Sequence, residues 1–239
     1  MVGPVNDARR AALSALIDHA PLFPPASLSA TDAIDEDRRA RADEHAWLLR
    51  RLVWPASAIG ELGDEERSLS VVLDGPWEGD ARAEAVETRW DDQLFGLVGE
   101  VYVELPLDEK LEAWVSVLAE RGFRAKVRCG GERVPAPEEL GRFLRACRKH
   151  RVPFKATAGL HHPLAAEGRH GFLNVLATCV FEDDDALVGQ VELDSDALRW
   201  DGREARADEL ARVRSEQFVA VGSCSFFEPV ADLHDLGIL

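Results

Sequence analysis

The chain has 239 residues, with 28 basic and 44 acidic side chains, which gives a formal net charge of −16. This acid excess argues against nucleic acid or an anionic membrane surface as the main partner, because both require positive charge on the protein. Hydrophobic residues make up 46% of the sequence, which argues against disorder. The composition predicts a soluble globular protein with a sizeable core, consisting of one domain or one domain plus a small extension.

No targeting segment or membrane span is expected. The first residues, MVGPVNDARR, contain no apolar stretch of the kind that a secretory signal needs. The longest nearly apolar run, 172–181, is far shorter than the roughly 20 residues of a membrane span. The four cysteines are widely separated and form no CxxC pair, so neither a zinc ribbon nor a disulfide framework is indicated. We therefore expect a cytoplasmic protein with reduced thiols.

Residues 1–48 are predicted to form a helical N-terminal extension. Apolar side chains recur at helical spacing over 5–19, PLFPP then interrupts the pattern, and a charged helical segment follows over about 30–49. We expect this extension to cap or flank a main domain over residues 49–239.

From residue 49 onward, short β-rich apolar runs alternate with helical or loop segments. The predicted strands are 51–55, 68–74, 83–89, 100–106, 123–129, 152–159, a doubtful one within 187–200, and 217–223. One amphipathic helix is predicted between 106 and 123 and ends at Gly122, and another, with proline at its start, is predicted between 129 and 152. This alternation predicts an α/β fold, a (β/α)8 barrel of TIM type, with an open doubly wound sheet as the competing architecture.

Two parts of the pattern fit the barrel imperfectly. Only eight residues separate Asp74 from Ala83, fewer than the dozen or so of a normal parallel crossover, so a degenerate loop is expected there. The seventh strand could be GQVELD or DALRW, and the second of these could instead belong to a hairpin around Asp201-Gly202.

Lysine is scarce, because only four of the 28 basic residues are lysines. A solvated helical face explains Lys110 and Lys149, whereas Lys126 and Lys155 fall in predicted strands. Successive strand side chains alternate, and the apolar neighbours of these lysines should meet the helices. Both lysines are therefore expected to point into the barrel.

The same alternation places further polar side chains on the inner side, at or near the carboxyl ends of successive strands. They are Asp74, Glu87, Tyr102, Glu104, Arg128 and Thr157. Charged residues at strand ends can be a solvated rim, but barrel enzymes keep their active sites at this end. Charges on five successive strands therefore predict a functional site.

Lys126 or Arg128 could lie close to Lys155, because neighbouring strands are about 4.8 Å apart. Two unit charges about 6 Å apart repel by about 3 kcal/mol at an effective dielectric constant near 20. Ion pairing with Glu104, an anionic substrate, or a lowered pKa of one lysine could relieve this repulsion. A partly neutral lysine could act as a Schiff-base nucleophile or a general base.

The segment KATAGLHHP resembles the Schiff-base lysine strand of the deoxyribose-phosphate aldolase family in Lys155, Thr157 and Gly159. The resemblance implies that Lys155 forms an imine with a carbonyl substrate. That family carries a second lysine on the following strand, whereas this chain has no lysine between 187 and 200. Lys126 would have to serve in its place.

Residues after the predicted strand 152–159 and at the end of the predicted strand 217–223 complete the candidate site. His161 or His162, on the loop after Lys155, is the predicted general acid and base, with an ordinary surface position as the alternative. Gly222 and Ser223 precede a helix start, where free backbone N–H groups favour an anion, and are predicted to bind the substrate's phosphate or carboxylate.

An alternative use of the acids is a metal site. Asp74, Glu87 and Glu104 end three successive predicted strands, and carboxylate ligands suit Mg²⁺ or Mn²⁺. In residue types this set resembles the enolase superfamily, which implies metal-stabilised enediolate chemistry with lysine bases.

Three hypotheses follow. The first is an enzyme, a lyase of aldolase type or an isomerase, that acts without a cofactor next to the carbonyl of a small anionic metabolite. In it Lys155 is the nucleophile or base, Lys126 and Arg128 hold the substrate anion, and Glu104 orients the cations. The second is divalent-metal-dependent enolisation. The third is a non-catalytic interaction or regulatory barrel, in which the inner charges form a buried ion-pair network.

Overall fold

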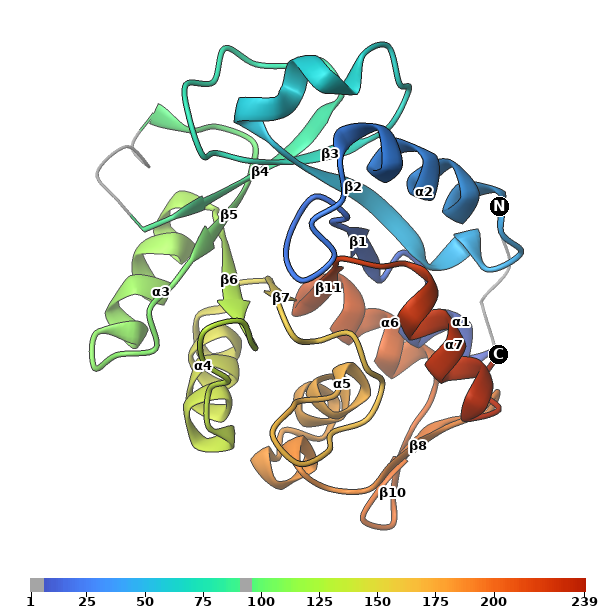
Figure 1. The fold of residues 1–239 in the computed structure, drawn as a ribbon. Coiled ribbons are helices and arrows are strands. Elements are labelled where there is room, and N and C mark those ends of the chain that lie inside the picture. The colour runs from blue at the N-terminus through green and yellow to red at the C-terminus, as the bar shows by residue number, and fades with distance from the viewer. Residues whose placement is uncertain (1–6, 91–95) are drawn as a thin grey trace.

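The computed structural model describes residues 7–90 and 96–239, and its strands close into a barrel (Figure 1). Eight strands of the described chain pair in parallel in the order β1-β2-β3-β4-β5-β6-β7-β11, and β11 pairs with β1. Their bounds are β1 Ile17–His19, β2 Leu49–Pro55, β3 Leu69–Val72, β4 Ala83–Arg89, β5 Glu100–Glu104, β6 Arg124–Arg128, β7 Phe154–Thr157 and β11 Phe218–Ser223. The predicted α/β barrel of TIM type is confirmed, and the open sheet is wrong.

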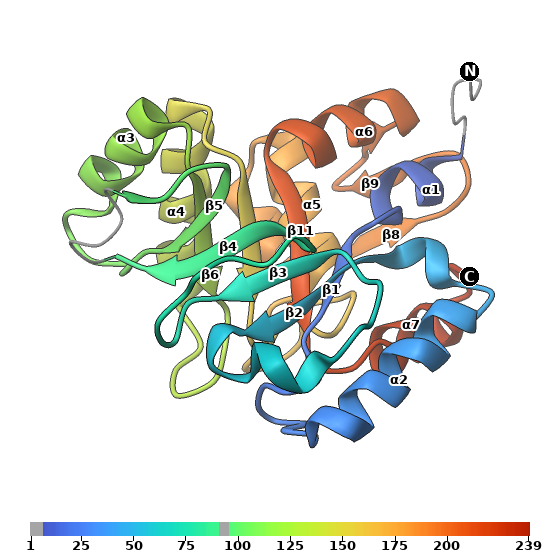
Figure 2. The same ribbon diagram turned by 90° about the horizontal axis from the view of Figure 1, so that it is seen from above.

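Helices lie on the outside of the barrel, and α3 to α6 cover it from β5 round to β11 (Figures 1 and 2). The α-helices are α1 Ala8–Leu13, α2 Ala30–Ala42, α3 Leu111–Arg121, α4 Pro137–His150, α5 Phe172–Phe181, α6 Ala207–Glu216 and α7 Phe227–Asp235. The 3₁₀ segments are η1 Ala46–Leu48, η2 Ala56–Leu62 and η4 Asp184–Leu187. Residues 73–82 join β3 to β4 without a helix, as the short spacing predicts.

The two central helices begin and end where the sequence predicts. Helix α3 stops at Gly122, which adopts a φ of +69°, a left-handed conformation that costs glycine little. Helix α4 starts with Pro137, whose fixed φ suits the first helical position. In the core between helices and strands, Phe154 of β7 contacts the rings of Phe143 on α4 and Phe218 on β11.

The predicted domain boundary before residue 49 is wrong, because Ile17–His19 form β1 and complete the barrel. Helix α1 ends at Leu13 and the chain turns at Ala15, with a φ of +48°, before pairing with β11 and β2. Buried Arg214 of α6 fixes this turn, donating to the carbonyls of Ala12 at 2.8 Å and Ser14 at 3.2 Å. The N-terminal region is therefore part of the barrel.

The doubtful seventh strand lies outside the barrel. Val191–Leu193 (β8), Leu198–Trp200 (β9) and Arg203–Ala205 (β10) form a separate antiparallel sheet, which Figure 1 shows at the periphery. Asp201-Gly202 forms the turn of its second hairpin, with positive φ at both residues. The hairpin alternative is therefore correct, and GQVELD also enters this sheet.

His19, at the end of β1, connects the barrel to α2. Its Nδ1 lies 3.3 Å from Asp37 and its Nε2 lies 3.4 Å from Glu36, both on α2. Burial alone would lower the pKa of His19, but these two carboxylates outweigh burial and raise it above its ordinary value. The imidazolium form thus helps to hold α2 on the barrel.

Candidate active site

Lys126 and Lys155 lie opposite each other on neighbouring strands β6 and β7, as the strand alternation predicts. Both side chains are buried, and both reach acids on the inner side of the barrel. The two ammonium groups share Glu87, whose two oxygens contact one lysine each. The predicted repulsion is therefore relieved by ion pairing, the first of the three expected routes.

Lys155 is fully buried, and Nζ donates to Asp18 Oδ2 and to Glu87 Oε1, each at 2.6 Å. Burial alone would lower the pKa of Lys155, but the charges of Asp18 and Glu87 outweigh burial and raise it above its ordinary value. The partly neutral lysine that a Schiff-base nucleophile requires is therefore not found at this position. Lys155 is a charged residue that positions two acids.

Lys126 is slightly more accessible than Lys155, with 8% of its side chain exposed. Its Nζ is 3.3 Å from Glu87 Oε2 and 3.2 Å from Glu104 Oε2. Glu87 Oε1 also accepts from the Ser70 hydroxyl at 2.7 Å. Burial alone would raise the pKa of Glu87, but the charges of Lys155 and Lys126 lower it to about 2. We call Asp18, Glu87, Glu104, Lys126 and Lys155 the axial charge network.

The axial charge network continues toward the amino ends of the strands. Arg50 lies 3.3 Å from Asp18 and donates to Glu100 at 2.8 Å. Glu100 also accepts from the Tyr102 hydroxyl at 2.8 Å and pairs with Arg124 at 3.1 Å. Burial alone would raise the pKa of Glu100, but its cationic and hydroxyl partners lower it to about 2. Tyr102, predicted to face inward, therefore belongs to the charged interior.

Sequence reasoning missed Asp18 and Arg50. The helical spacing over 5–19 predicts a helical extension around Asp18, and its three-residue strand is too short to show alternation. The only local signal is the Leu16-Ile17 pair before it, followed by the proline-rich break. Arg50 lies just before the predicted strand 51–55, where the β1–β2 register shifts.

Arg128 and Thr157 lie opposite each other at the carboxyl ends of β6 and β7. Arg128 has 48% of its side chain exposed, and its Nη1 lies 4.0 Å from Glu104 Oε2. It is thus the predicted anion-binding residue that solvent reaches most readily. Thr157 Oγ1 donates to the Val127 carbonyl at 3.4 Å, so its hydroxyl is engaged with the neighbouring strand.

The backbone beyond β7 is strained and closely packed. Ala158 has a φ of +53° and Gly159 a φ of +80°, and the first is costly for a residue with a Cβ. A Cβ at Gly159 would lie 2.9 Å from the Cα of Gly130, on the loop after β6. The two loops that border Lys126 and Lys155 are therefore held in contact. Such strain is concentrated at functional sites.

His161 is placed where it could accept a proton. Its Nδ1 lies 3.1 Å from Ser223 Oγ, and that hydroxyl donates its hydrogen to the Ser225 carbonyl at 2.6 Å. Ser223 must then accept from Nδ1–H, which leaves Nε2 as the basic nitrogen of the neutral ring. Burial lowers the pKa of His161, although the charge of Glu228 opposes this effect.

His162, the other candidate, faces α7. Its Nδ1 hydrogen-bonds to Asp232, and its Nε2 lies 3.8 Å from Glu228. Both ring nitrogens are therefore directed toward acids of one outer helix. Of the two predicted histidines, His161 is the better candidate for the base.

Gly222 and Ser223, whose backbone N–H groups are predicted to bind the substrate's anion, are the last two residues of β11. Ser223 is fully buried, and its hydroxyl is occupied by Ser225 and His161. A Cβ at Gly222 would lie 2.9 Å from the Thr157 side chain, so Gly222 permits close packing of β7 and β11. Both residues lie at the end of β11, and anion binding by their backbone N–H groups stays a prediction.

The alternative metal triad is not assembled. β3 ends at Val72, so strand alternation no longer directs Asp74, which instead accepts from the Ser57 backbone at 2.9 Å and hydroxyl at 2.6 Å. Glu87 and Glu104 are bridged by Lys126. Among residues 7–90 and 96–239, no group of three or more His, Cys, Asp or Glu side chains is arranged to hold a metal ion. The prediction that Asp74 joins the two glutamates is therefore wrong.

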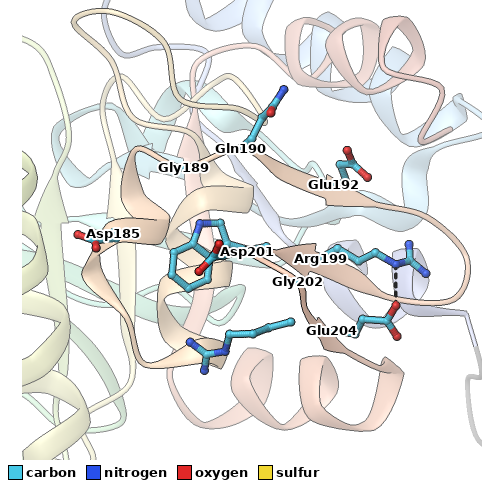
Figure 3. Close-up of a pocket in the computed structure, with 10 residues that line it drawn as sticks. Asp185, Gly189, Gln190, Glu192, Arg199, Asp201, Gly202 and Glu204 are labelled. Atoms are coloured by element: carbon cyan, nitrogen blue, oxygen red, sulfur yellow. Dashed lines mark hydrogen bonds and ion pairs between the residues drawn. The ribbon is translucent and has the colours of Figure 1, made fainter.

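A separate cavity of about 720 Å³ lies on the peripheral sheet (Figure 3). Figure 3 shows Glu192, Arg199 and Glu204 along it, and Arg199 pairs with Glu204 at 3.0 Å. None of the site residues predicted from the sequence lines this cavity. It is therefore distinct from the axial charge network.

Comparisons with known proteins do not add a family to these observations. No protein-family model matches the sequence, and a search of curated proteins finds no significant match. Within the described part of the chain, every helix is too short or too polar to span a bilayer.

Proposed function

We propose that this chain is a barrel enzyme, a lyase or an isomerase, that acts next to the carbonyl group of a small anionic metabolite. The observation that carries the proposal is the polarity of the barrel axis. Such barrels are normally filled by layers of branched apolar side chains, whereas this axis holds two lysines and three acids from five strands. Buried ion pairs are often less stabilising than apolar side chains of similar volume. Chemistry therefore explains this interior better than stability does.

Lys126 is the lysine that a substrate could reach. Glu87 and Glu104 both contact Nζ, and 8% of the side chain is exposed, while Lys155 is fully enclosed. An ammonium group held in this way can donate to a carbonyl oxygen and stabilise the negative charge that develops there. If the reaction proceeds through an imine, Lys126 is the amine that would form it.

Two further residues complete the proposed reaction. Arg128, half exposed beside Glu104, would bind the carboxylate or phosphate of the substrate. His161, with Nε2 unprotonated, would take the proton from the carbon next to the carbonyl. Glu104 would orient the two cations, and Lys155 would position Glu87 and Asp18 without touching the substrate.

The proposed compartment is the cytosol. All four cysteines are free thiols and all are buried, a pattern suited to a reducing environment.

Hydrogen exchange at carbon tests the proposal without knowledge of the full reaction. The protein is incubated in D₂O with a panel of 2-oxo acids, hydroxyketones and sugar phosphates, and deuterium uptake next to the carbonyl is measured by mass spectrometry. We expect uptake into at least one compound, and we expect Lys126→Met and His161→Asn to abolish it. Lys110→Met, at an exposed position, is the matched control and should retain it.

Borohydride trapping with the same panel, followed by peptide mapping, distinguishes an imine on Lys126 from non-covalent enolisation. The opposite outcome is no uptake, no adduct and no panel compound that raises the melting temperature. That combination would favour the non-catalytic alternative, an interaction or regulatory barrel. The complete internal pairing of the axial charge network is the observation that supports this second candidate.

A further inference from the structure

We propose that His45 and His234 form a surface binding site for a divalent transition-metal ion such as Zn²⁺, Ni²⁺ or Cu²⁺. His45 immediately precedes η1, and His234 belongs to α7. The two residues are 189 positions apart in sequence, yet their Nε2 atoms lie 2.9 Å from each other. This site is separate from the axial charge network and does not depend on the proposed function.

The orientation of the rings suits shared coordination. Their centroids are 4.7 Å apart, the ring planes meet at 73°, and the Nε2 atoms are closer together than the centroids. The rings therefore approach through their nitrogens and open away from that contact. A metal ion bound between the two Nε2 atoms would take one ligand from each ring.

The dimensions of the contact are close to those that a metal needs. Two Zn–N bonds of about 2.0–2.1 Å at a tetrahedral angle place the nitrogens about 3.3–3.4 Å apart. The present contact would have to open by roughly 0.5 Å, which small side-chain rotations supply because His234 is exposed and His45 is partly exposed. Imidazole nitrogen suits Zn²⁺, Ni²⁺ and Cu²⁺, whereas Mg²⁺ prefers oxygen ligands.

The proton count of the pair also permits binding. Without metal, one Nε2 must donate a hydrogen and the other must accept it, because two acceptor nitrogens at this distance would repel. With metal, both rings bind through Nε2 and carry their hydrogen on Nδ1. Neither Nδ1 atom has a hydrogen-bond partner within the described part of the chain, so both can carry it. The proton moves from Nε2 to Nδ1 through solvent, and the neutral pair releases none.

A bound ion would connect two distant parts of the chain. His45 precedes β2 and His234 lies in the last helix, so the ion would tie α7 to the segment that leads into the barrel. A ligand that binds only the folded state stabilises that state. Metal binding should therefore raise the melting temperature as well as produce a binding signal.

Calorimetric titration of the whole protein with ZnCl₂, in a non-coordinating buffer near pH 7.5, tests the site. We expect saturable binding of a single ion, and we expect His45→Ala and His234→Ala each to weaken it by about tenfold or more, because one imidazole remains. His150→Ala is the matched control, since His150 lies on α4 beside Glu112, and it should bind like the wild type. MgCl₂ should produce no saturable signal.

A spectroscopic readout makes the ligand assignment independent of affinity. Electron paramagnetic resonance of the Cu²⁺-loaded protein should show two nitrogen ligands in the wild type and fewer in either variant. Zn²⁺ binding that survives in both alanine variants, or that is lost instead in His162→Ala near Asp232 and Glu228, would overturn the proposal. The absence of saturable Zn²⁺ binding to the folded wild type would overturn it as well.

Discussion

Replacing Lys155 by methionine should lower the free energy of unfolding by about 3–5 kcal/mol at pH 7, the usual loss when one partner of a buried ion pair is removed. The substitution nearly conserves side-chain volume, so the effect comes mainly from charge. Asp18 and Glu87 each lose a contact of 2.6 Å. Asp18 keeps Arg50 at 3.3 Å, and Glu87 keeps Lys126 at 3.3 Å, which limits the loss.

The pKa of Glu87 gives the scale of its combined interactions with Lys155, Lys126 and Ser70. Lys155 and Lys126 lower that pKa from 4.5 to about 2 against the opposing effect of burial. At about 1.4 kcal/mol per pKa unit, the difference corresponds to about 3 kcal/mol. A lowered carboxyl pKa stabilises the fold above the unfolded value, and this contribution is lost as the pH falls from about 4.5 toward 2. The difference between wild type and Lys155→Met should therefore narrow in acid.

Urea unfolding followed by circular dichroism at pH 7 and near pH 3 measures both effects. Lys110→Met, at an exposed position, is the matched control and should change the unfolding free energy by less than about 0.5 kcal/mol. Adding Glu87→Gln to Lys155→Met should recover part of the loss, because it removes one of the two negative charges that Lys155 pairs with. A Lys155→Met protein as stable as the wild type at pH 7 would refute this account of the axial charge network.

Three other measurements probe different parts of the fold. Asp37 and Glu36 raise the pKa of His19 despite burial, so protonated His19 stabilises the fold fully below pH 6.5, and this contribution is lost as the pH rises through the higher folded pKa. Urea midpoints measured at pH 6–9 should show this decline, and His19→Asn should lack it. Asn174→Ala should lower the free energy of unfolding by about 3 kcal/mol or more, because its buried amide forms hydrogen bonds of 2.7–2.8 Å with the backbone of Ala165, Ala186 and Gly189. An unchanged midpoint in chemical denaturation would contradict this. An alanine at Gly159 would have a φ of +80° and a Cβ 2.9 Å from Gly130, whereas an alanine at Gly168 would have only the unfavourable φ of +73°. By calorimetry, Gly159→Ala should therefore lower the melting temperature more than Gly168→Ala, and equal shifts would argue against the close approach.

Much of the barrel could be predicted from local patterns. Seven of the eight barrel strands follow from short apolar runs between helical segments or turns, and Gly122 and Pro137 mark helix boundaries through backbone conformation alone. Alternation along β6 and β7 also predicts that Lys126 and Lys155 point inward. These features depend on neighbours within a few positions, which the sequence displays directly.

The sequence did not reveal which charges meet inside the barrel. β1 has only three residues, too few for a period of two to be recognised, and the apolar side chains at helical spacing over 5–19 favour a helix there. The acid it supplies, Asp18, lies 137 positions from Lys155, and no local pattern indicates that these residues touch. For Asp74, strand alternation predicts an inward-facing side chain, but β3 ends two residues earlier and alternation does not apply there.

The sequence by itself determined that two scarce lysines face the interior, because side-chain direction in a strand is a local property. Only the tertiary structure decided that Lys155 is fully enclosed between two acids and that Lys126 keeps a small exposed fraction. The protonation state of a group depends on every charge within a few ångströms and on its access to water. Folding brings these charges together from segments that are distant in sequence.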